Sequence, residues 1–131
     1  MTISEAIEQY EGVAFSYGEI DCCLFVCNVI RDVTGIDYGA PWRGRYSTEL
    51  GAAKQVKRHR NMAGIASAAF GKLRPIWSVK AGDPVLLAPE QVERDSIGEG
   101  LGIYDGTDLV MMTEKGLHRT KIMSGLGCWN V

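Results

Sequence analysis

Three cysteines lie close together at the start of an apolar segment of the chain. Cys22 and Cys23 are adjacent, Cys27 follows four residues later, and Asp21 directly precedes them. Aspartate is a preferred N-cap residue, so Asp21 is placed to begin a helix whose first residue is Cys22. Backbone N–H groups and the positive end of the helix dipole favour a thiolate at that position. The spacing predicts a cysteine nucleophile at a helix start, although cysteine is as often a small buried hydrophobic residue.

The segment that follows has the periodicity of a buried helix. Apolar residues recur on one helical face, at Cys22, Phe25, Val26, Val29, Ile30 and Val33. A polar turn at residues 16–19 precedes Asp21, and Gly35 follows as the C′ residue that ends the helix. We therefore expect a buried helix over residues 22–33 with Cys22 in its first turn.

The cysteine pattern also admits a metal site. Neighbouring helical residues diverge by about 100° around the axis, so three cysteines in one helix do not form a disulfide framework. Cys23 and Cys27 lie one turn apart and could share a metal with Cys128 or His118. The paired C-x-x-C spacing of typical zinc sites is missing. A metal or iron–sulfur site at Cys22, Cys23, Cys27 and Cys128 stays open as a weaker alternative, and we expect no cofactor.

Length and composition are those of one soluble globular domain. The chain has 131 residues, of which 46% are hydrophobic and 23% charged, and its formal net charge is −2. This charge gives no reason to expect nucleic acid as a partner, and the apolar runs are too short for membrane insertion. The polar N-terminus does not resemble a signal peptide. We expect a single domain over residues 1–131 that stays in the cytoplasm or leaves it without an N-terminal signal.

The first half of the chain has helical periodicity. Besides the central helix, we expect helices over residues 3–10, 49–60 and 62–70. The 49–60 helix ends in a basic cluster that suits the negative end of a helix dipole, and we place His59 at this solvated end. Segment 36–48 fits neither period and is predicted to be a loop.

From Pro75 onward the sequence favours β structure. Short apolar segments predict strands at residues 76–79, 85–88, 101–104, 109–112, 117–120 and 128–131. Asp105–Gly106 between two of them is a strong hairpin signal. The polar segment 89–100 is predicted to be a loop. Helices followed by a meandering antiparallel sheet predict an α+β fold, with N-terminal helices packed on a C-terminal sheet.

Arginine and aromatic residues in the 36–48 loop form a candidate partner-binding surface. Arg43 and Arg45 lie beside Trp42 and Tyr46. Side chains of these types are enriched at protein interfaces. Stacking of the arginines on the two rings, which would fix the loop, explains the same residues. Both interpretations stay open.

Four short motifs occur in order along the chain: Tyr17–Gly18, Asp21–Cys22, Gly82–Asp83–x–Val85 and Gly102–Ile103–Tyr104. In this order they resemble the NlpC-like branch of the papain-like cysteine peptidases. The resemblance implies a papain-like fold in which Cys22 is the nucleophile at a helix start. It also implies a histidine on the neighbouring sheet as the general base.

Further motifs extend over nearly the whole chain. They are Asp21–Cys22–x–Leu24–Phe25, Thr34–Gly35–x–Asp37, Trp42–Arg43–Gly44–Arg45–Tyr46, Gly51–Ala52, Gly116–Leu117 and Trp129–x–Val131. Their order and spacing resemble a small group of phage and prophage domains encoded among tail genes. This resemblance implies other phage tail proteins as partners. It implies the virion, at the tail tip or baseplate, as the location, with the host cytoplasm before assembly.

The chain departs from the NlpC-like pattern at the catalytic histidine. Where those peptidases carry His-x-Gly-Ile-Tyr, residues 100–104 read Gly-Leu-Gly-Ile-Tyr, so Gly100 holds the position of the base. The third, orienting polar residue aligns near Met111 or Met112, and neither can take that role. Of the two histidines in the chain, His118 is the candidate base. Loss of a general base ordinarily costs such an enzyme several orders of magnitude in rate.

Three hypotheses follow. The first is a structural or assembly protein of a phage tail with a degenerate NlpC-like fold, which explains the missing histidine. The second is an active cysteine peptidase or amidase that cleaves peptidoglycan stem peptides as a phage enters its host, with Cys22 as nucleophile and His118 as base. The third is a metal-binding tail module. We favour the first, because Gly100 holds the position of the catalytic base, and a fold alone does not establish an activity.

Overall fold

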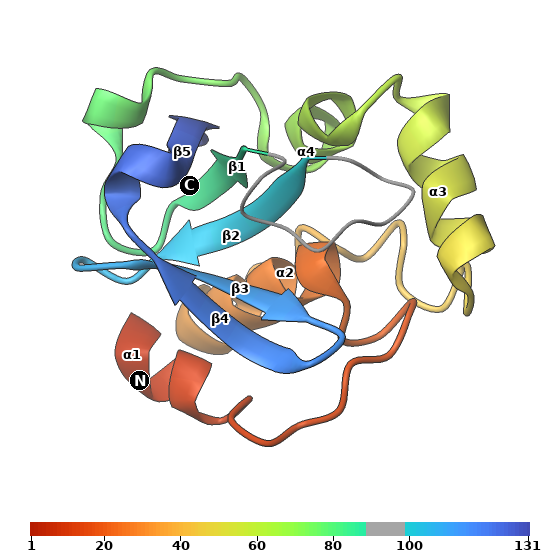
Figure 1. Cartoon of the computed structure of the whole chain (residues 1–131), viewed down its shortest axis with the longest axis horizontal. Coiled ribbons are helices and arrows are strands. Elements are labelled where there is room, and N and C mark those ends of the chain that lie inside the picture. The colour runs from red at the N-terminus through yellow and green to blue at the C-terminus, as the bar shows by residue number, and fades with distance from the viewer. Residues whose placement is uncertain (89–98) are drawn as a thin grey trace.

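The computed structural model describes residues 1–88 and 99–131. Most of the predicted 89–100 loop therefore lies outside the described residues. Helices precede strands along the chain, and the strands form one antiparallel sheet (Figure 1). The helices are α1 (Ile3–Glu8), α2 (Cys22–Thr34), α3 (Glu49–Arg58) and α4 (Met62–Phe70). The strands are β1 (Pro84–Leu87), β2 (Gly100–Tyr104), β3 (Leu109–Thr113), β4 (Gly116–Thr120) and β5 (Gly125–Cys128).

The sheet has the strand order β4-β3-β2-β1-β5, and each strand pairs antiparallel with its neighbours. Helix α2 lies against one face of the sheet, over β2 and β3 (Figure 1). The predicted α+β class is therefore confirmed, with N-terminal helices on a C-terminal antiparallel sheet. No helix of the described residues is long and apolar enough to cross a membrane.

Helix α2 begins and ends where the sequence predicts. The side chain of Asp21 caps its N-terminus, and Gly35 takes the left-handed conformation at φ 81° after its last turn. Phe25, Val29 and Ile30 of the predicted stripe are at most 1% exposed. Leu24 and Cys27 lie off that stripe and are buried as well. The helix is therefore covered on more sides than its amphipathic period indicates.

Hydrophobic side chains pack on both faces of the sheet. The larger cluster joins α1, α2 and α4 to one face and includes Trp129, which is fully buried. A smaller cluster on the other face joins Val85, Leu87, Leu109, Met111 and Cys128. Ile76 and Ile122 cover part of it; they belong to two short 3-10 helices, η1 (Ile76–Ser78) and η3 (Ile122–Ser124).

Two predicted strands differ from the structure. Residues 76–79 were expected to form a strand, but 76–78 form η1, in which the hydroxyl and N–H of Ser78 both donate to Pro75 O. The last strand, expected at 128–131, is β5 at Gly125–Cys128. A Cβ atom at Gly125 would lie 2.7 Å from Ile76 Cδ1, so close packing there requires glycine. A glycine-rich strand lacks the alternating apolar pattern by which strands are predicted.

Two predicted helices end earlier than expected. Helix α1 stops at Glu8 rather than residue 10, and α3 stops at Arg58 rather than residue 60. After α3, Arg60 has a positive φ of 78°, which is incompatible with continuing the helix. His59 is half-buried, and its ring lies 6.0 Å from that of Trp42 between centroids. His59 is the C-cap residue of α3, so it lies at the helix end as expected, although it is less exposed than the neighbouring basic residues.

Trp129 and Trp77 provide a matched test of this core. Trp129 is 0% exposed and its Nε1 donates to Ser67 Oγ, whereas Trp77 is 83% exposed. Trp129→Ala should lower the free energy of unfolding by about 3–5 kcal/mol, because it leaves a large cavity. Trp77→Ala should change it by no more than about 0.5 kcal/mol. Urea unfolding of both variants measures the difference, and equal losses would contradict the described packing.

Candidate functional site

The carboxylate of Asp21 connects three segments around the start of α2. Its Oδ1 accepts the N–H of Leu24 at 2.9 Å, which is the N-cap bond of the helix. Its Oδ2 accepts the N–H of Gly18 at 3.0 Å and the hydroxyl of Tyr46 at 2.5 Å. Asp21 is 3% exposed. One buried side chain therefore fixes the turn before the helix, the helix start and the loop that follows α2.

Gly18 and Tyr46 approach each other closely at this point. Gly18 has φ +84°, and a Cβ atom there would lie 2.0 Å from the backbone oxygen of Tyr46. Only glycine therefore fits. Burial, followed by the charge of Asp21, raises the pKa of the Tyr46 hydroxyl. Tyr46 thus keeps its proton and remains a hydrogen-bond donor to Asp21.

A cavity of about 160 Å³ lies beside the start of α2. The first turn of α2, helices α3 and α4, and adjoining ends of β2 and β3 contribute its walls. Cys22 is half-buried and lines this cavity. Aromatic residues supply much of the lining: Phe15, Tyr17, Trp42, Tyr46 and Phe70. The helix-start thiol thus lies at an enclosed space that could hold part of a ligand.

The three clustered thiols have different surroundings. The sulfur atoms of Cys22 and Cys23 lie 3.8 Å apart, and the Cys23 thiol donates to Met62 Sδ at 3.4 Å. The contact with Cys22, followed by burial, raises the pKa of Cys23 well above its usual value. Burial raises the pKa of Cys27 to about 12. Cys23 and Cys27 therefore stay protonated at neutral pH, which leaves Cys22 as the thiol best placed to react.

Gly100 shares this cavity with Cys22. It is the first residue of β2 and pairs with Leu87 of β1. Met112, at one of the two positions aligned with the third polar residue of the peptidases, lines the cavity too. The aligned base position thus lines the same cavity as the aligned nucleophile, but it carries no side chain.

Neither histidine lines the cavity. His118 lies on β4 at the edge of the sheet, directly opposite Met111 of β3. Directly paired residues point to the same face, and Met111 packs in the cluster on the face away from α2. His118 is exposed there. The structure therefore does not bring His118 to Cys22, and its role as base stays a prediction.

The four residues of the candidate partner surface have different surroundings. Trp42 and Tyr46 are half-buried and line the cavity. Arg43 Nε and Nη2 donate to the two carboxylate oxygens of Asp37, each at 2.9 Å. Arg45 is exposed. Arg43 thus braces the loop through a carboxylate rather than by stacking on an aromatic ring.

The fourth cysteine is separate from the other three. Cys128 is fully buried on β5, in the cluster on the face away from α2. Its thiol donates to Pro75 O at 3.3 Å. Within residues 1–88 and 99–131, no group of three or more His, Cys, Asp or Glu side chains is arranged to hold a metal ion. The geometry gives the metal hypothesis no support.

All charged residues described in the cavity lining are acidic: Asp21, Glu49, Glu99 and Glu114. The Tyr17 hydroxyl donates to Glu114 at 2.9 Å. A ligand with a cationic group would therefore suit the cavity better than an anion. Sequence reasoning missed Glu49 and Glu114 because they come from α3 and the β3–β4 turn, far from Cys22 in the chain.

Residues 1–131 match a family described as a domain of unknown function, DUF6950. The chain belongs to this family. No curated protein matches it in sequence. Its structure is similar to the crystal structure of the NlpC/p60 domain of the peptidoglycan hydrolase SagA, with a TM-score of 0.58 and 15% sequence identity. The similarity covers 99% of this chain and 97% of the SagA domain.

This similarity shows that the DUF6950 chain has an NlpC/p60-like fold, and at 15% identity it shows nothing more. The expected papain-like architecture is therefore confirmed. Peptidoglycan hydrolysis is stated for SagA alone. The phage tail assignment rests only on the sequence resemblance.

The surroundings of the thiols predict the order in which they react. Brief treatment of the native protein with a thiol reagent at neutral pH should label Cys22 first, because thiolates react and the pKa of Cys27 is about 12. Mass spectrometry of the digested protein locates the label. Preferential labelling of Cys27 would contradict the assignment of Cys22 as the reactive thiol.

Removal of the N-cap side chain of α2 should lower the free energy of unfolding more than removal of an ordinary N-cap does. Asp21→Ala should lower the free energy of unfolding by more than about 2 kcal/mol, because it also leaves the Tyr46 hydroxyl without its acceptor. Thr48→Ala is the matched control, since the Thr48 side chain caps α3 through Gly51 N alone and should cost about 1 kcal/mol. Chemical denaturation compares the two, and a smaller loss for Asp21→Ala would show that the three-way contact adds nothing.

Proposed function

We propose that this chain is a structural or assembly-associated protein of a phage tail, at the tip or baseplate, with an NlpC-like fold that has lost its hydrolytic machinery. Its partners would be other tail proteins. It would reside in the host cytoplasm before assembly and in the virion afterwards. The motif order described above supports the tail assignment.

The absence of a histidine from the described cavity lining carries the non-hydrolytic part of this proposal. A cysteine peptidase needs a group to take the thiol proton and later to protonate the departing nitrogen. Gly100 shares the cavity with Cys22 and has no side chain for this purpose. His118 lies on an edge strand and does not line the cavity. Cys22 would then serve mainly as the first residue of a buried helix.

An active peptidase or amidase acting on peptidoglycan stem peptides is the second candidate. The position of Cys22 favours it, since a half-buried thiol at a helix N-terminus lines an enclosed cavity. The base would then have to come from a partner chain or from a carboxylate of the lining such as Glu114. Both candidates predict a protein of the infecting particle, but only the second requires the thiol.

Complementation of a phage that lacks this gene separates the two candidates. Cys22→Ala should leave infectivity and particle shape unchanged, provided that its thermal unfolding matches the wild type. Arg45→Glu should lower infectivity by disturbing a partner surface, because Arg45 is exposed in the loop next to the cavity. Arg58→Glu, at the exposed end of α3, is the matched control and should have no effect.

The outcomes are distinct. Loss of infectivity in Cys22→Ala alone, with normal particles by electron microscopy, would show a working enzyme. Normal particles and infectivity without the gene would remove the tail assignment altogether. Equal losses for Arg45→Glu and Arg58→Glu would remove the loop as the partner surface.

A further inference from the structure

The surface around edge strand β5 carries exposed apolar side chains together with basic ones. This region, the β5 surface, is formed by residues 71–80, which include η1, and residues 121–131, which include η3 and β5. Among the described residues, eight large hydrophobic side chains are exposed, and five of them belong to the β5 surface: Leu73, Trp77, Met123, Leu126 and Val131. Single exposed apolar residues are ordinary, whereas their concentration in one region indicates an interaction surface.

The two segments of the β5 surface lie side by side. Arg74 and Cys128 exchange two backbone hydrogen bonds, with N···O distances of 2.6 and 3.0 Å. A Cβ atom at Gly125 would lie 2.7 Å from Ile76 Cδ1 of η1 and 3.2 Å from Ile122 O of η3, so the two short helices meet at this glycine. Figure 1 shows the segment before β1, in green, beside β5 and the C-terminus.

Trp77 and Met123 protrude into solvent from these two helices. The residue before each of them, Ile76 or Ile122, packs against the cluster on the sheet face away from α2. Trp77 is 83% exposed and Met123 is 87% exposed. Neither residue belongs to the described lining of the cavity at Cys22. Two apolar side chains therefore project from a rigid base that is fixed by the core.

The charges of the β5 surface are basic. Its two segments contain Lys72, Arg74, Lys80 and Lys121, all exposed, and no aspartate or glutamate. Since the formal net charge of the chain is −2, the rest of the chain carries −6. One described ion pair reaches this surface from outside, with Asp108 Oδ1 3.5 Å from Lys121 Nζ. An anionic surface would therefore attract this side of the molecule and repel the remainder.

This combination of side chains fits a lipid interface. The indole ring of an exposed tryptophan favours the headgroup level of a bilayer, and basic side chains are attracted to anionic lipids. A protein partner would need a hollow shaped for each protruding side chain, whereas a fluid interface closes around them. The basic charge selects an anionic membrane over a neutral one.

We propose that the β5 surface binds peripherally to a membrane that contains anionic lipids. Trp77 and Met123 enter the interface, and the four basic side chains contact lipid headgroups. No segment of the chain spans the bilayer in this arrangement. The inference goes beyond the proposed function, does not involve the cavity at Cys22, and stands whether or not the chain acts in a phage tail.

Co-sedimentation of the full chain with lipid vesicles tests the proposal. The protein should bind vesicles of phosphatidylcholine that contain about one-third phosphatidylglycerol, and it should not bind vesicles of phosphatidylcholine alone. Binding should weaken as the salt concentration rises, because salt screens the attraction between exposed charges.

Variants locate the binding surface. Trp77→Ala should weaken binding at least about tenfold, because it removes the largest apolar group that enters the interface. Lys80→Glu should weaken binding about twentyfold, since each basic side chain near an anionic surface contributes about fivefold and the substitution reverses a charge. Lys54→Glu is the matched control, because Lys54 is an exposed lysine on α3, at the other end of the molecule in Figure 1.

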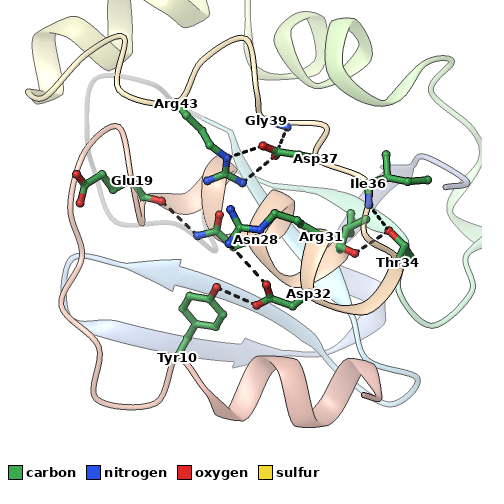
Figure 2. Close-up of polar contacts among 11 residues, drawn as sticks. Tyr10, Glu19, Asn28, Arg31, Asp32, Thr34, Ile36, Asp37, Gly39 and Arg43 are labelled. Atoms are coloured by element: carbon green, nitrogen blue, oxygen red, sulfur yellow. Dashed lines mark hydrogen bonds and ion pairs between the residues drawn. The ribbon is translucent and has the colours of Figure 1, made fainter.

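A second matched pair tests the apolar contribution. Leu126 and Ile36 are both 53% exposed, but Ile36 follows α2, where its N–H donates to Thr34 Oγ1 (Figure 2). Leu126→Ser should weaken vesicle binding, and Ile36→Ser should bind as the wild type does. Near-UV circular dichroism verifies that each variant keeps the native packing.

Quenching of tryptophan fluorescence by lipids brominated in their acyl chains reports contact with the interface. The bound wild type should be quenched, because Trp77 enters the interface, whereas the buried Trp129 does not reach it. Trp77→Phe, at vesicle concentrations that keep it bound, should lose this quenching.

Four results would overturn the proposal. They are no binding to the anionic vesicles, equal binding to neutral vesicles, equal losses in the β5-surface variants and their controls, and no quenching that depends on Trp77. If vesicles are not bound and Trp77→Ala abolishes self-association in sedimentation velocity, the β5 surface is a contact between copies of this chain.

Discussion

The structure around the candidate site depends on one buried carboxylate. Asp21 accepts hydrogen bonds from Gly18, Leu24 and Tyr46, which belong to a turn, a helix and a loop. A buried carboxylate is stable only if its oxygens are paired, so these three segments must come together for the chain to fold. The position of Cys22 follows, because it is the first residue after the cap.

The hydrogen bonds of Asp21 explain the position of Cys22 without reference to catalysis. In an NlpC-like peptidase, a cysteine at the start of a capped helix is interpreted as an activated nucleophile. Here the same cap also fixes the loop that carries Trp42 and Tyr46, and this requirement exists without any reaction. An Asp–Cys pair at a helix start can therefore persist for structural reasons. The glycine at position 100 is consistent with this view, since it removes the base and leaves β2 paired with β1.

The parts of the fold that could be predicted are those with local signals. Asp21, Gly35 and the apolar period between them specify α2, and Asp105–Gly106 specifies the β2–β3 hairpin. The position of strand β5 could not be predicted, because its glycines are selected by contacts with Ile76 and Leu73 and not by alternation. The turn at η1 was mistaken for a strand because Ile76 and Val79 cover a sheet face, a tertiary role that short apolar segments do not reveal.

The candidate site was predicted in part for the same reason. Cys22 and Gly100 were aligned through local motifs, and the structure places both at one cavity. The acidic lining and the second contact of Asp21 with Tyr46 depend on residues distant in sequence.

We propose that the NlpC-like cavity of this chain lacks hydrolytic activity of its own. Incubation of the purified protein with peptidoglycan stem-peptide fragments, followed by mass spectrometry of the products, tests it most directly. The wild type and Cys22→Ala should both release no more product than buffer does. Cleavage by the wild type that Cys22→Ala abolishes would contradict the account and show that another group replaces the missing histidine.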